Sequence, residues 1–600
     1  MLPLLLLAAC ASLSVAKTVT YNFDIGWVIA APDGFARPVI GINGQWPIPT
    51  IEANVGDEIV VNVQNSLGNE TTSLHFHGMY QRGTASADGA VGLGQCPIAP
   101  GDSYTYRFIA NPAGTHWYHS HDKGQYPDGL RGKMIIHDPA WEASLNVDKQ
   151  YYLSMGDWYH TQFPYLVHDY LSPNNTNGDF PSPDSFLFNE TRTMPKLKFA
   201  PGKRYLIRIV NFSAVACNLF HIDGHPLIVV GVDGVEVQPQ TTDSVLICAG
   251  QRYDFVVEGM KKPQGNYKMV AKMTTDMFTK DIPSDDVLTL TGEIVYDLVS
   301  LLGKIVDTVV NALFNWKTWS PPANTILNDM TLRPLDNEKL LTGVNNYIEL
   351  RTNQTFYPGV GTRIGLGLLP WTEPKLPSLY TALTTGKDAN KPATYGVGVD
   401  PWVLQSNDVV QVYMENPQIY PHPMHLHGHT FQVVARGTGT WDRNEAALPS
   451  VPMKLVIPAN GYIVLRFRAD NPGVWFFHCH IDFHLVGGMA STFIEAPSQL
   501  QASQSVPAQG AAICVKDGQC VKGNCACKQG AISASDSFYQ CNTIFNDDGM
   551  NFGALVSPPN MMAMMARDVV KGSGQKVRKS EIGKKAREGA GHRRAGLLKK

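Results

Sequence analysis

The sequence His478-Cys479-His480-Ile-Asp-Phe-His484-Leu-Val-Gly-Gly-Met489 gathers five side chains of the types that bind copper and related metal ions. On a β-strand, alternate side chains face opposite sides of the sheet. His478 and His480 therefore share one face, and Cys479 points to the other. If all three bind metal, a thiolate site and an imidazole site lie back to back. Electrons that reach the thiolate one at a time could then pass directly to a second metal centre.

Three more pairs of histidines, each with one residue between its members, lie upstream: His75 and His77, His119 and His121, and His425 and His427. With His478 and His480 they make four pairs, from a chain that contains 18 histidines. In an extended segment each pair projects both rings to one side, so that four pairs can converge on one compact cluster. A single pair can be structural or accidental, but four pairs indicate a polynuclear metal cluster.

Cys479 belongs to a second kind of site. Two imidazoles, one thiolate and a long axial thioether are typical of blue copper. His422, His484 and Met489 complete that set around Cys479, and His422 lies three residues before His425. The thiol must lose its proton to bind, and coordination to the metal ensures that it does.

Four segments together resemble the copper signatures of the multicopper oxidases. They are His-Phe-His-Gly at 75–78, Trp-Tyr-His-Ser-His at 117–121, His-Pro-Met-His-Leu-His-Gly at 422–428, and the stretch at 478–489. They follow one another in the order found in the family, within a match that runs from about residue 18 to residue 497.

The resemblance implies four copper ions per chain: one type 1, one type 2 and two type 3. His422, Cys479 and His484 would hold the type 1 copper, with Met489 in the axial position. The type 2 copper would be held by His75 and His425. The type 3 pair would be held by the remaining paired histidines, which are His77, His119, His121, His427, His478 and His480.

Seven of the other histidines are left out of this ligand set, and we expect none of them to bind copper. They are His116, His137, His160, His168, His221, His225 and His429. His116 and His429 lie beside the motifs, so structural or supporting roles are expected for them. The sequence also contains no nucleotide-binding glycine loop, and nothing in it supports a nucleic-acid partner.

The fold class predicted from the sequence is all-β. Short apolar runs such as 58–64 and 205–211 are separated by turns, and the chain contains 54 glycines and 40 prolines. The resemblance implies three consecutive cupredoxin-like β-barrel or sandwich domains, at about 18–145, 146–320 and 330–498. Copper ligands would come from the first and third domains only. The cluster would therefore lie at an interface, and metal binding would be coupled to folding.

Four segments lie outside this core. Residues 1–16 are predicted to be a signal peptide, which indicates a secreted protein, extracellular or in the cell wall. The apolar spacing of 294–314 predicts an amphipathic helix inserted near the end of the middle domain. A cysteine-containing extension is expected at 499–570, and a basic disordered tail at 571–600. No transmembrane anchor is apparent after the signal, and we expect a monomer.

Glycosylation and disulfides fit secretion. Five sequons permit glycosylation, at Asn69, Asn174, Asn189, Asn211 and Asn353. Of the ten cysteines, Cys10 leaves with the signal and Cys479 is assigned to copper. Cys217 and Cys248 are expected to pair, and the resemblance implies that Cys96 pairs with Cys514 or Cys541. The cysteines from 514 to 527 favour disulfides, with a bound metal ion as the alternative.

Dioxygen takes up four electrons and four protons to become two waters, so acids are expected near the cluster. Asp88 and Asp482 occupy positions that resemble the proton-relay carboxylates of the family, and Asp482 lies between two predicted ligands. A copper-storage or electron-transfer protein would need only the Cys479 site, and a coat protein would need none. The complete set of histidines therefore favours an oxidase.

The electron donor is the open question. Iron-transport ferroxidases tend to carry Glu where this chain has Asp157 and Asp where it has Gln418. Asp281 could supply a further acid, but its alignment is uncertain by one residue. These departures favour a laccase-like oxidase of phenols, with pigment formation as one role it could fill. Asp157 would accept the phenolic proton. The alternative is a ferroxidase that oxidises Fe(II) to Fe(III).

Overall fold

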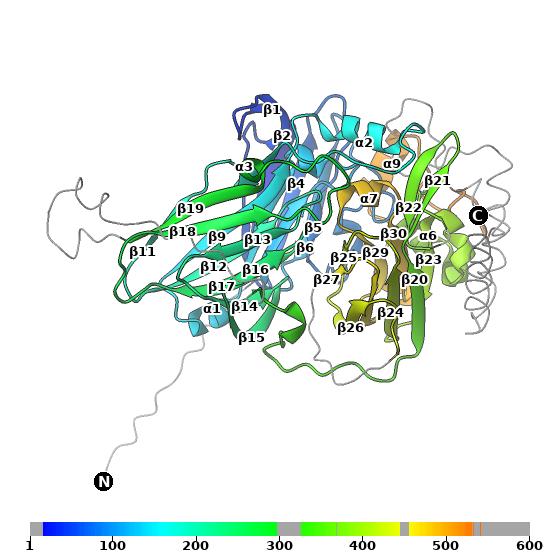
Figure 1. Cartoon of the computed structure of the whole chain (residues 1–600). Helices are drawn as coiled ribbons and strands as arrows, with labels where there is room; N and C mark the ends of the chain where they lie inside the picture. Colours follow the sequence, from blue (N-terminus) through cyan, green and yellow to red (C-terminus); the bar gives the residue numbers. More distant parts are fainter. Residues whose placement is uncertain are drawn as a thin grey trace, which may run out of the picture.

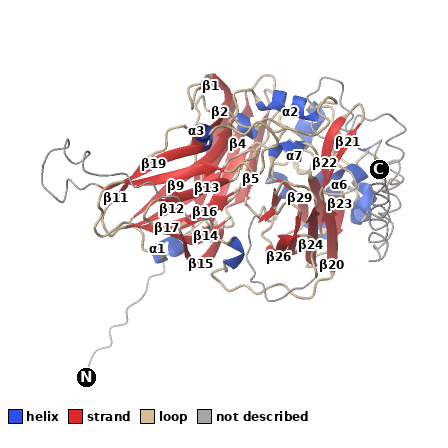
Figure 2. Cartoon of the chain, viewed as in Figure 1, coloured by secondary structure: helices blue, strands red, loops and turns tan. Residues whose placement is uncertain are grey.

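The computed structural model describes residues 16–296, 326–367, 369–443 and 455–530, together with residues 532 and 541. Strands dominate these segments, as Figure 2 shows in red, and helices are few and short. The predicted all-β fold class is therefore confirmed. The strands form three successive pairs of facing sheets and one separate hairpin. Each pair falls within one of the three expected domain ranges, whose exact boundaries stay a prediction.

Two four-stranded sheets form the first domain. One has the order β2-β1-β4-β6, with β1 (Thr18–Ala30), β2 (Arg37–Ile42), β4 (Glu58–Asn65) and β6 (Ser103–Ile109). The other has the order β3-β8-β7-β5, with β3 (Ile51–Asn54), β5 (His75–His77), β7 (Gly114–His119) and β8 (Arg131–His137). Strand β6 shows why the sheets pack face to face: Tyr104, Tyr106 and Phe108 are buried, and the residues between them point toward solvent.

The middle domain follows the short helix α1 (Pro139–Ser144), whose first turn is capped by the Asp138 carboxylate. Its larger sheet has the order β10-β9-β12-β17-β14-β15, with β9 (Lys149–Trp158), β10 (Ser185–Phe188), β12 (Arg204–Asn211), β14 (Leu227–Val232), β15 (Val235–Thr242) and β17 (Arg252–Glu258). Strand β12 is buried on both faces. The Arg208 guanidinium of β12 donates to the Thr115 hydroxyl of β7 at 3.3 Å. Strand β12 therefore packs against the first domain.

The second sheet of the middle domain has the order β11-β19-β18-β13-β16. Its strands are β11 (Lys196–Phe199), β13 (Asn218–Ile222), β16 (Ser244–Ile247), β18 (Tyr267–Met273) and β19 (Thr289–Tyr296). Two helices, α2 (Phe163–Leu171) and α3 (Asp285–Leu288), also belong to this part of the chain. The inserted helix expected at 294–314 lies almost entirely outside the described residues.

The third domain carries the copper-binding motif at 478–489. One sheet has the order β20-β24-β28-β26, with β20 (Asn346–Arg351), β24 (Val409–Asn416), β26 (Gln432–Thr438) and β28 (Gly461–Arg468). The other has the order β23-β30-β29-β25-β27, with β23 (Pro401–Leu404), β25 (His422–Leu426), β27 (Leu455–Ile457), β29 (Gly473–Cys479) and β30 (Ala490–Glu495). Strands β21 (Asn353–Tyr357) and β22 (Gly361–Gly365) form a hairpin.

Several helices complete the third domain and the start of the extension. They are α6 (Ser378–Thr384), α7 (Asp482–Val486), α8 (Pro497–Ser503) and α9 (Ala508–Lys516). Short 3-10 turns lie at η1 (Ala85–Ala87), η2 (Tyr126–Asp128), η4 (Asp329–Thr331), η5 (Gly386–Asn390), η6 (Pro392–Thr394) and η7 (Val397–Val399). In Figure 1 the first and third domains meet where β5 faces β25 and β29.

Four disulfides lie within the described residues: Cys96–Cys514, Cys217–Cys248, Cys520–Cys527 and Cys525–Cys541. The expected Cys217–Cys248 pair is confirmed, and Cys96 takes Cys514 rather than Cys541. The alternative of a metal ion held by the C-terminal cysteines is wrong, since all of them are consumed in disulfides. Cys479 is buried and lies outside these disulfides.

Some expectations fall where the structure gives no description. These are the signal peptide, of which only Ala16 is described, and the tail at 571–600. Among the residues that are described, no helix is long and apolar enough to cross a membrane. Asn211 is fully buried, and its side-chain amide donates to two backbone carbonyls, so this sequon is inaccessible to a glycan in the folded protein.

Candidate copper centres

The predicted ligands lie at the ends of strands that face one another. His75 is paired with His119 across β5 and β7, and His425 is paired with His478 across β25 and β29. In the same register Met424 is paired with Cys479, which places Cys479 on the opposite face of β29 from His478. His478 and Cys479 therefore face opposite sides of β29, as the sequence predicts.

The candidate type 1 group contains His422, Cys479 and His484. Cys479 Sγ lies 3.8 Å from His422 Nδ1 and 3.6 Å from His484 Nδ1, and the two nitrogens are 3.1 Å apart. Three possible ligand atoms thus converge on one point, in a set that suits a blue copper site. Met489 is fully buried beside them, and its carbonyl accepts the N–H of Cys479 at 3.0 Å.

The type 1 histidines are held as neutral imidazoles. Burial lowers the pKa of His484 to about 3, and burial together with the nearby His484 lowers the pKa of His422 well below its usual range. Neutral imidazole is the form that binds metal. His422 Nε2, on the far side of its ring from Cys479, donates to Gln418 Oε1 at 2.6 Å. Gln418 therefore fixes the orientation of the His422 ring.

The eight paired imidazoles gather at the interface of the first and third domains. His75 stacks on His427 with ring centroids 4.0 Å apart, and His77 stacks on His425 at 3.8 Å. Within this set, three overlapping groups have nitrogens close enough to share a metal ion. These groups are His75 with His425 and His427, His75 with His77 and His119, and His121 with His427 and His478. The His480 ring centroid lies 5.1 Å from that of His77.

Hydrogen bonds orient the paired histidines. Nδ1 of His119 bonds to the Ser120 carbonyl at 2.8 Å, and Nδ1 of His478 bonds to the Cys479 carbonyl at 2.8 Å. Each ring therefore turns its Nε2 inward, the arrangement that supporting hydrogen bonds impose at metal sites. The buried Nε2 atoms of His75 and His121 make no hydrogen bond within the described residues. A buried unsatisfied nitrogen is costly unless a metal ion binds it, so this set fits copper.

Asp88 contacts two of the predicted ligands. Its Oδ2 lies 2.8 Å from His427 Nδ1, and its Oδ1 lies 3.4 Å from His75 Nδ1. Burial alone would raise the pKa of this carboxyl, but the two imidazoles lower it well below its usual range. Asp88 thus orients both rings, His427 through its ionised carboxylate and His75 through its backbone carbonyl, which lies 2.7 Å from His75 Nδ1. Its predicted role in proton relay stays a prediction.

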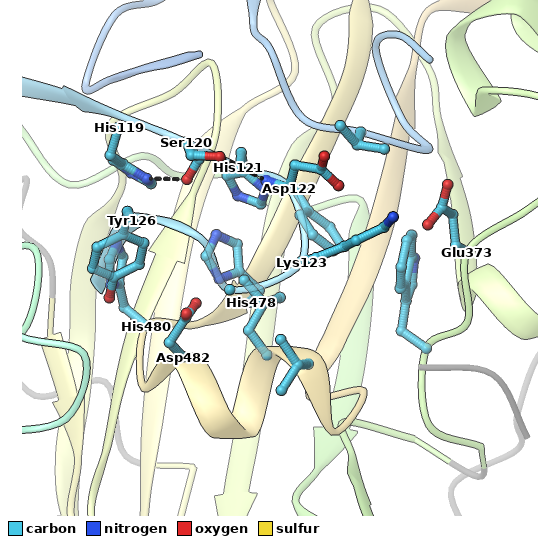
Figure 3. A pocket seen from close by; sticks show the side chains of 16 residues that line it. His119, Ser120, His121, Asp122, Lys123, Tyr126, Glu373, His478, His480 and Asp482 are labelled. Carbon is cyan, nitrogen blue, oxygen red and sulfur yellow. Dashed lines mark hydrogen bonds between the residues drawn. The ribbon is translucent and has the colours of Figure 1, made fainter. Parts of the chain in front are cut away.

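Asp482 lines a cavity next to the paired histidines, as Figure 3 shows. Burial and the nearby Asp157 raise its pKa to about 8, so this carboxyl holds a proton at neutral pH. The same cavity is lined by Tyr126, by four predicted ligands of the type 3 pair (His119, His121, His478 and His480) and by other residues. A protonated acid facing these histidines suits the predicted relay role of Asp482.

Asp157 does not lie where the sequence placed it. Its side chain is fully buried, and its carboxylate accepts the backbone N–H groups of Ala214, Val215 and Ala216 at 2.7–3.1 Å. A carboxylate enclosed in this way cannot meet an electron donor at the type 1 edge. The donor-side role predicted for Asp157 is therefore wrong. Burial was the deciding fact, and the local sequence does not reveal it.

The seven histidines set aside from the sequence lie outside the four metal-capable groups found among the described residues. Most are engaged elsewhere. His225 Nε2 lies 2.6 Å from the Tyr296 hydroxyl, His429 Nε2 lies 3.0 Å from Glu495, and His137 Nδ1 lies 2.7 Å from Glu142. His116 Nε2 lies 3.3 Å from the Ala113 carbonyl. These contacts give them structural roles.

Sequence reasoning missed residues that border both centres. The ring of Phe180 lies 5.6 Å from that of His484 and helps to cover it. Lys123 and Glu373 line the cavity beside the paired histidines. Phe180 and Glu373 could not be found from spacing, because each lies on a segment with no metal motif. Lys123 follows the motif at 117–121, but only the folded chain shows that it faces Glu373.

Family comparisons cover most of the chain. Three family models described as multicopper oxidase match residues 24–140, 149–297 and 371–499. These segments correspond to the three pairs of sheets, with the predicted ligands in the first and last.

Several curated relatives are similar over nearly the whole chain. An iron transport multicopper oxidase, FET3, of Gibberella zeae is 41% identical over 531 residues, which is 87% of this chain and 83% of the relative. The iron transport multicopper oxidase fetC of Epichloe festucae is 39% identical over 538 residues, with the same two coverages.

Solved structures give the same result. The structure described as Fet3p, a multicopper oxidase that functions in iron import, matches with a TM-score of 0.78 and 33% identity, over 84% of this chain and 96% of that one. The laccase from Botrytis aclada matches with a TM-score of 0.69 and 28% identity, over 84% and 91%. Members of this family carry one type 1, one type 2 and two type 3 coppers. The thiolate group and the eight imidazoles fit that complement, and the chain belongs to the multicopper oxidase family.

Proposed function

We propose that this multicopper oxidase takes electrons from Fe(II), releases Fe(III), and uses the electrons to reduce dioxygen to water. The observation that carries the proposal is the similarity to iron transport oxidases, at 39–41% identity over 87% of the chain. The solved Fet3p structure also matches better than the laccase structure, with TM-scores of 0.78 and 0.69. The phenol oxidase favoured by the sequence becomes the second candidate.

Within this proposal, His422, Cys479 and His484 hold the type 1 copper with Met489 axial, and His75 and His425 hold the type 2 copper. The type 3 pair is held by His77, His119, His121, His427, His478 and His480. The bound coppers supply one-electron redox chemistry. The convergence of Sγ and the two Nδ1 atoms supports the first assignment, and the inward Nε2 atoms support the others.

Two acidic residues lie on loops that border the type 1 group. The backbone N–H of Phe180 donates to Thr279 Oγ1 at 3.0 Å, which ties the loop after α2 to the loop after β18. Asp179 precedes Phe180 on one loop, and Asp281 lies exposed on the other. Carboxylates bind Fe(III) more tightly than Fe(II), so an Fe(II) ion held beside them is easier to oxidise. These acids support Fe(II) as the donor.

The protein contributes orientation and protons. Gln418 fixes the His422 ring on the donor side. Cys479 and His478 are adjacent residues, which gives electrons a short covalent path from one centre to the other. On the oxygen side Asp88 holds His75 and His427 in place, and Asp482 presents its buried carboxyl to the cavity.

Oxidation of phenols is the second candidate, and one contact favours it. The residue at the outer edge of His422 is the neutral Gln418, where an acid would bind iron more tightly. An organic donor needs only an approach to a histidine edge, and His484 retains 6% exposure while His422 has none.

Steady-state rates on Fe(II) and on a substituted phenol test the donor. Asp179→Asn and Asp281→Asn should lower kcat/KM for Fe(II) about tenfold when combined, since each removes an anionic group near the donor edge. The kcat/KM for the phenol should not change. Gln418→Glu should raise the preference for Fe(II). Asp148→Asn, an exposed carboxylate paired with Lys203 in the middle domain, is the matched control. Unchanged Fe(II) kinetics in the double variant, with phenol faster in the wild type, would establish the second candidate instead.

We also propose export from the cell, because four disulfides are typical of secreted proteins. The expected monomer stays a prediction, and size-exclusion chromatography with light scattering tests it.

A further inference from the structure

The cavity beside the paired histidines has a charged mouth. Its volume is about 70 Å³, and a buried water needs roughly 10–15 Å³ measured in the same way, so several waters fit. Most lining residues are fully buried. Four lining residues keep partial exposure, and Glu373 and Lys123 are the carboxylate and the ammonium group among them. Asp482 is buried at the inner part, beside His480.

Lys123 and Glu373 come from different domains and point toward one another, with the Asp122 carboxylate next to them (Figure 3). Asp122 is fixed by the Thr71 hydroxyl, which donates to its Oδ2 at 2.6 Å. Gly92 lies against the Glu373 side chain: a Cβ added there would approach Glu373 Cγ to 2.7 Å. The loop carrying Gly92 therefore holds the Glu373 side chain tightly in its position at the mouth.

The C-terminal extension completes this cluster. Helix α9 is bonded to the first domain through the Cys96–Cys514 disulfide and through an ion pair of Lys516 with Asp102. Asp517, at the end of α9, is close enough to act electrostatically on both Glu373 and Lys123. The extension thus brings an exposed carboxylate to the outer side of the mouth.

We propose that Glu373, which faces Lys123 at the mouth, is the group through which protons enter the cavity when the enzyme reduces dioxygen. In each transfer the Glu373 carboxyl gives its O–H proton to a water in the cavity and takes another from solvent on the Asp517 side. The electrons come from the donor through Cys479, so dioxygen, four electrons and four protons yield two waters. Asp482 acts further in, and Glu373 is the outer station.

The electrostatics of the site suit this role. Burial raises the pKa of Glu373 to about 7, with Asp122 and Asp517 adding to the rise and the Lys123 ammonium opposing it. The loop at Gly92 adds no charge. A group that is half protonated near neutral pH both gives and takes protons readily. Below that pKa Glu373 carries the proton, so the rate of proton entry should fall as pH rises through about 7.

The inference concerns dioxygen reduction, which is the activity of the family, and not the choice of donor. It therefore stands or falls independently of the proposed oxidation of Fe(II).

The first test is Glu373→Gln in the full-length, copper-loaded enzyme. The reduced protein is mixed rapidly with dioxygen, and its reoxidation is followed by the return of the type 1 absorption. We expect reoxidation to slow about tenfold or more, within the range known for loss of a proton-transfer group. Anaerobic bleaching of the type 1 absorption by the donor should not change. The matched control is Glu236→Gln, another partly buried carboxyl with a raised pKa in the middle domain.

A second readout does not depend on turnover. In an infrared pH titration, the difference between wild type and Glu373→Gln isolates the protonated-carboxyl band of Glu373, which should titrate near pH 7. Lys123→Gln removes the opposing cation and should move this titration to higher pH. Asp517→Asn removes an acid and should move it to lower pH. The pH at which the reoxidation rate falls should move in the same direction as the infrared titration in both variants.

These shifts of opposite sign separate proton entry from a structural role. Parallel movement of the infrared titration and of the pH at which the rate falls supports the proposal. Reoxidation in Glu373→Gln at the wild-type rate, or a rate that falls at the same pH while the infrared titration moves, overturns it. Asp517→Asn changes an exposed residue, so it serves even if substitution of Glu373 impairs folding.

Discussion

His427 Nδ1 lies 2.8 Å from Asp88 Oδ2, and this contact joins a ligand of the third domain to a loop of the first. Asp88 also lies 3.4 Å from His75. Asp88→Asn removes the negative charge that orients His427 and lies beside His75, and loss of such a partner typically lowers metal affinity about 10–100-fold. We expect copper bound by the paired histidines to be lost on dialysis against a chelator, while the blue type 1 absorption remains. Full retention of all four coppers would contradict this role.

Cys479 contributes the one thiol of the type 1 group. Cys479→Ser should abolish the blue absorption and turnover, because a hydroxyl cannot replace the thiolate as ligand and electron path. Copper counts should fall by about one per chain, as the paired histidines on the other face of β29 are unaffected. The control is His168→Gln, an exposed histidine outside the four metal-capable groups. Surviving turnover would show that electrons enter by another route.

Met489 should set the type 1 potential. An axial thioether stabilises Cu(II), and the axial ligand tunes the potential of blue copper sites. Met489→Leu keeps the buried volume close to constant, so redox titration of the blue absorption should give a higher potential. An unchanged or lower potential would remove Met489 from the axial position.

Arg131 and Glu190 form a buried ion pair between the first and middle domains. Arg131 Nε and Nη2 donate to the two carboxylate oxygens at 2.9 and 3.0 Å, and the Arg131 side chain is fully buried. Glu190→Ala leaves that charge uncompensated and should cost about 3–5 kcal/mol of unfolding free energy, measured by denaturant titration. Glu349→Ala breaks an exposed pair with Arg443 and should change it by less than about 1 kcal/mol. Similar losses in both would contradict this account.

The predicted copper ligands could be found from the sequence because metal ligands must satisfy local spacing. His75 and His77, two residues apart, share a face wherever the chain is extended, and the restricted chemistry of Cys479 with two histidines points to copper. The fold class followed from the same motifs and from the frequency of turns.

The remaining features depend on where distant segments meet. Asp157 lies in a recognisable motif, yet three backbone N–H groups from a later loop enclose it. The partner of Cys96 was ambiguous between two cysteines until the position of α9 decided it. Glu373 and Lys123 are separated by most of two domains, so only the folded chain shows that they share a cavity.

Fe(II) is the donor proposed for the type 1 copper. The most direct measurement is the anaerobic rate at which the blue type 1 absorption of the copper-loaded protein bleaches on rapid mixing with Fe(II), compared with a substituted phenol at the same concentration. We predict that Fe(II) bleaches it at least about tenfold faster, since acids border that edge. Faster bleaching by the phenol would contradict the account and identify a phenol oxidase.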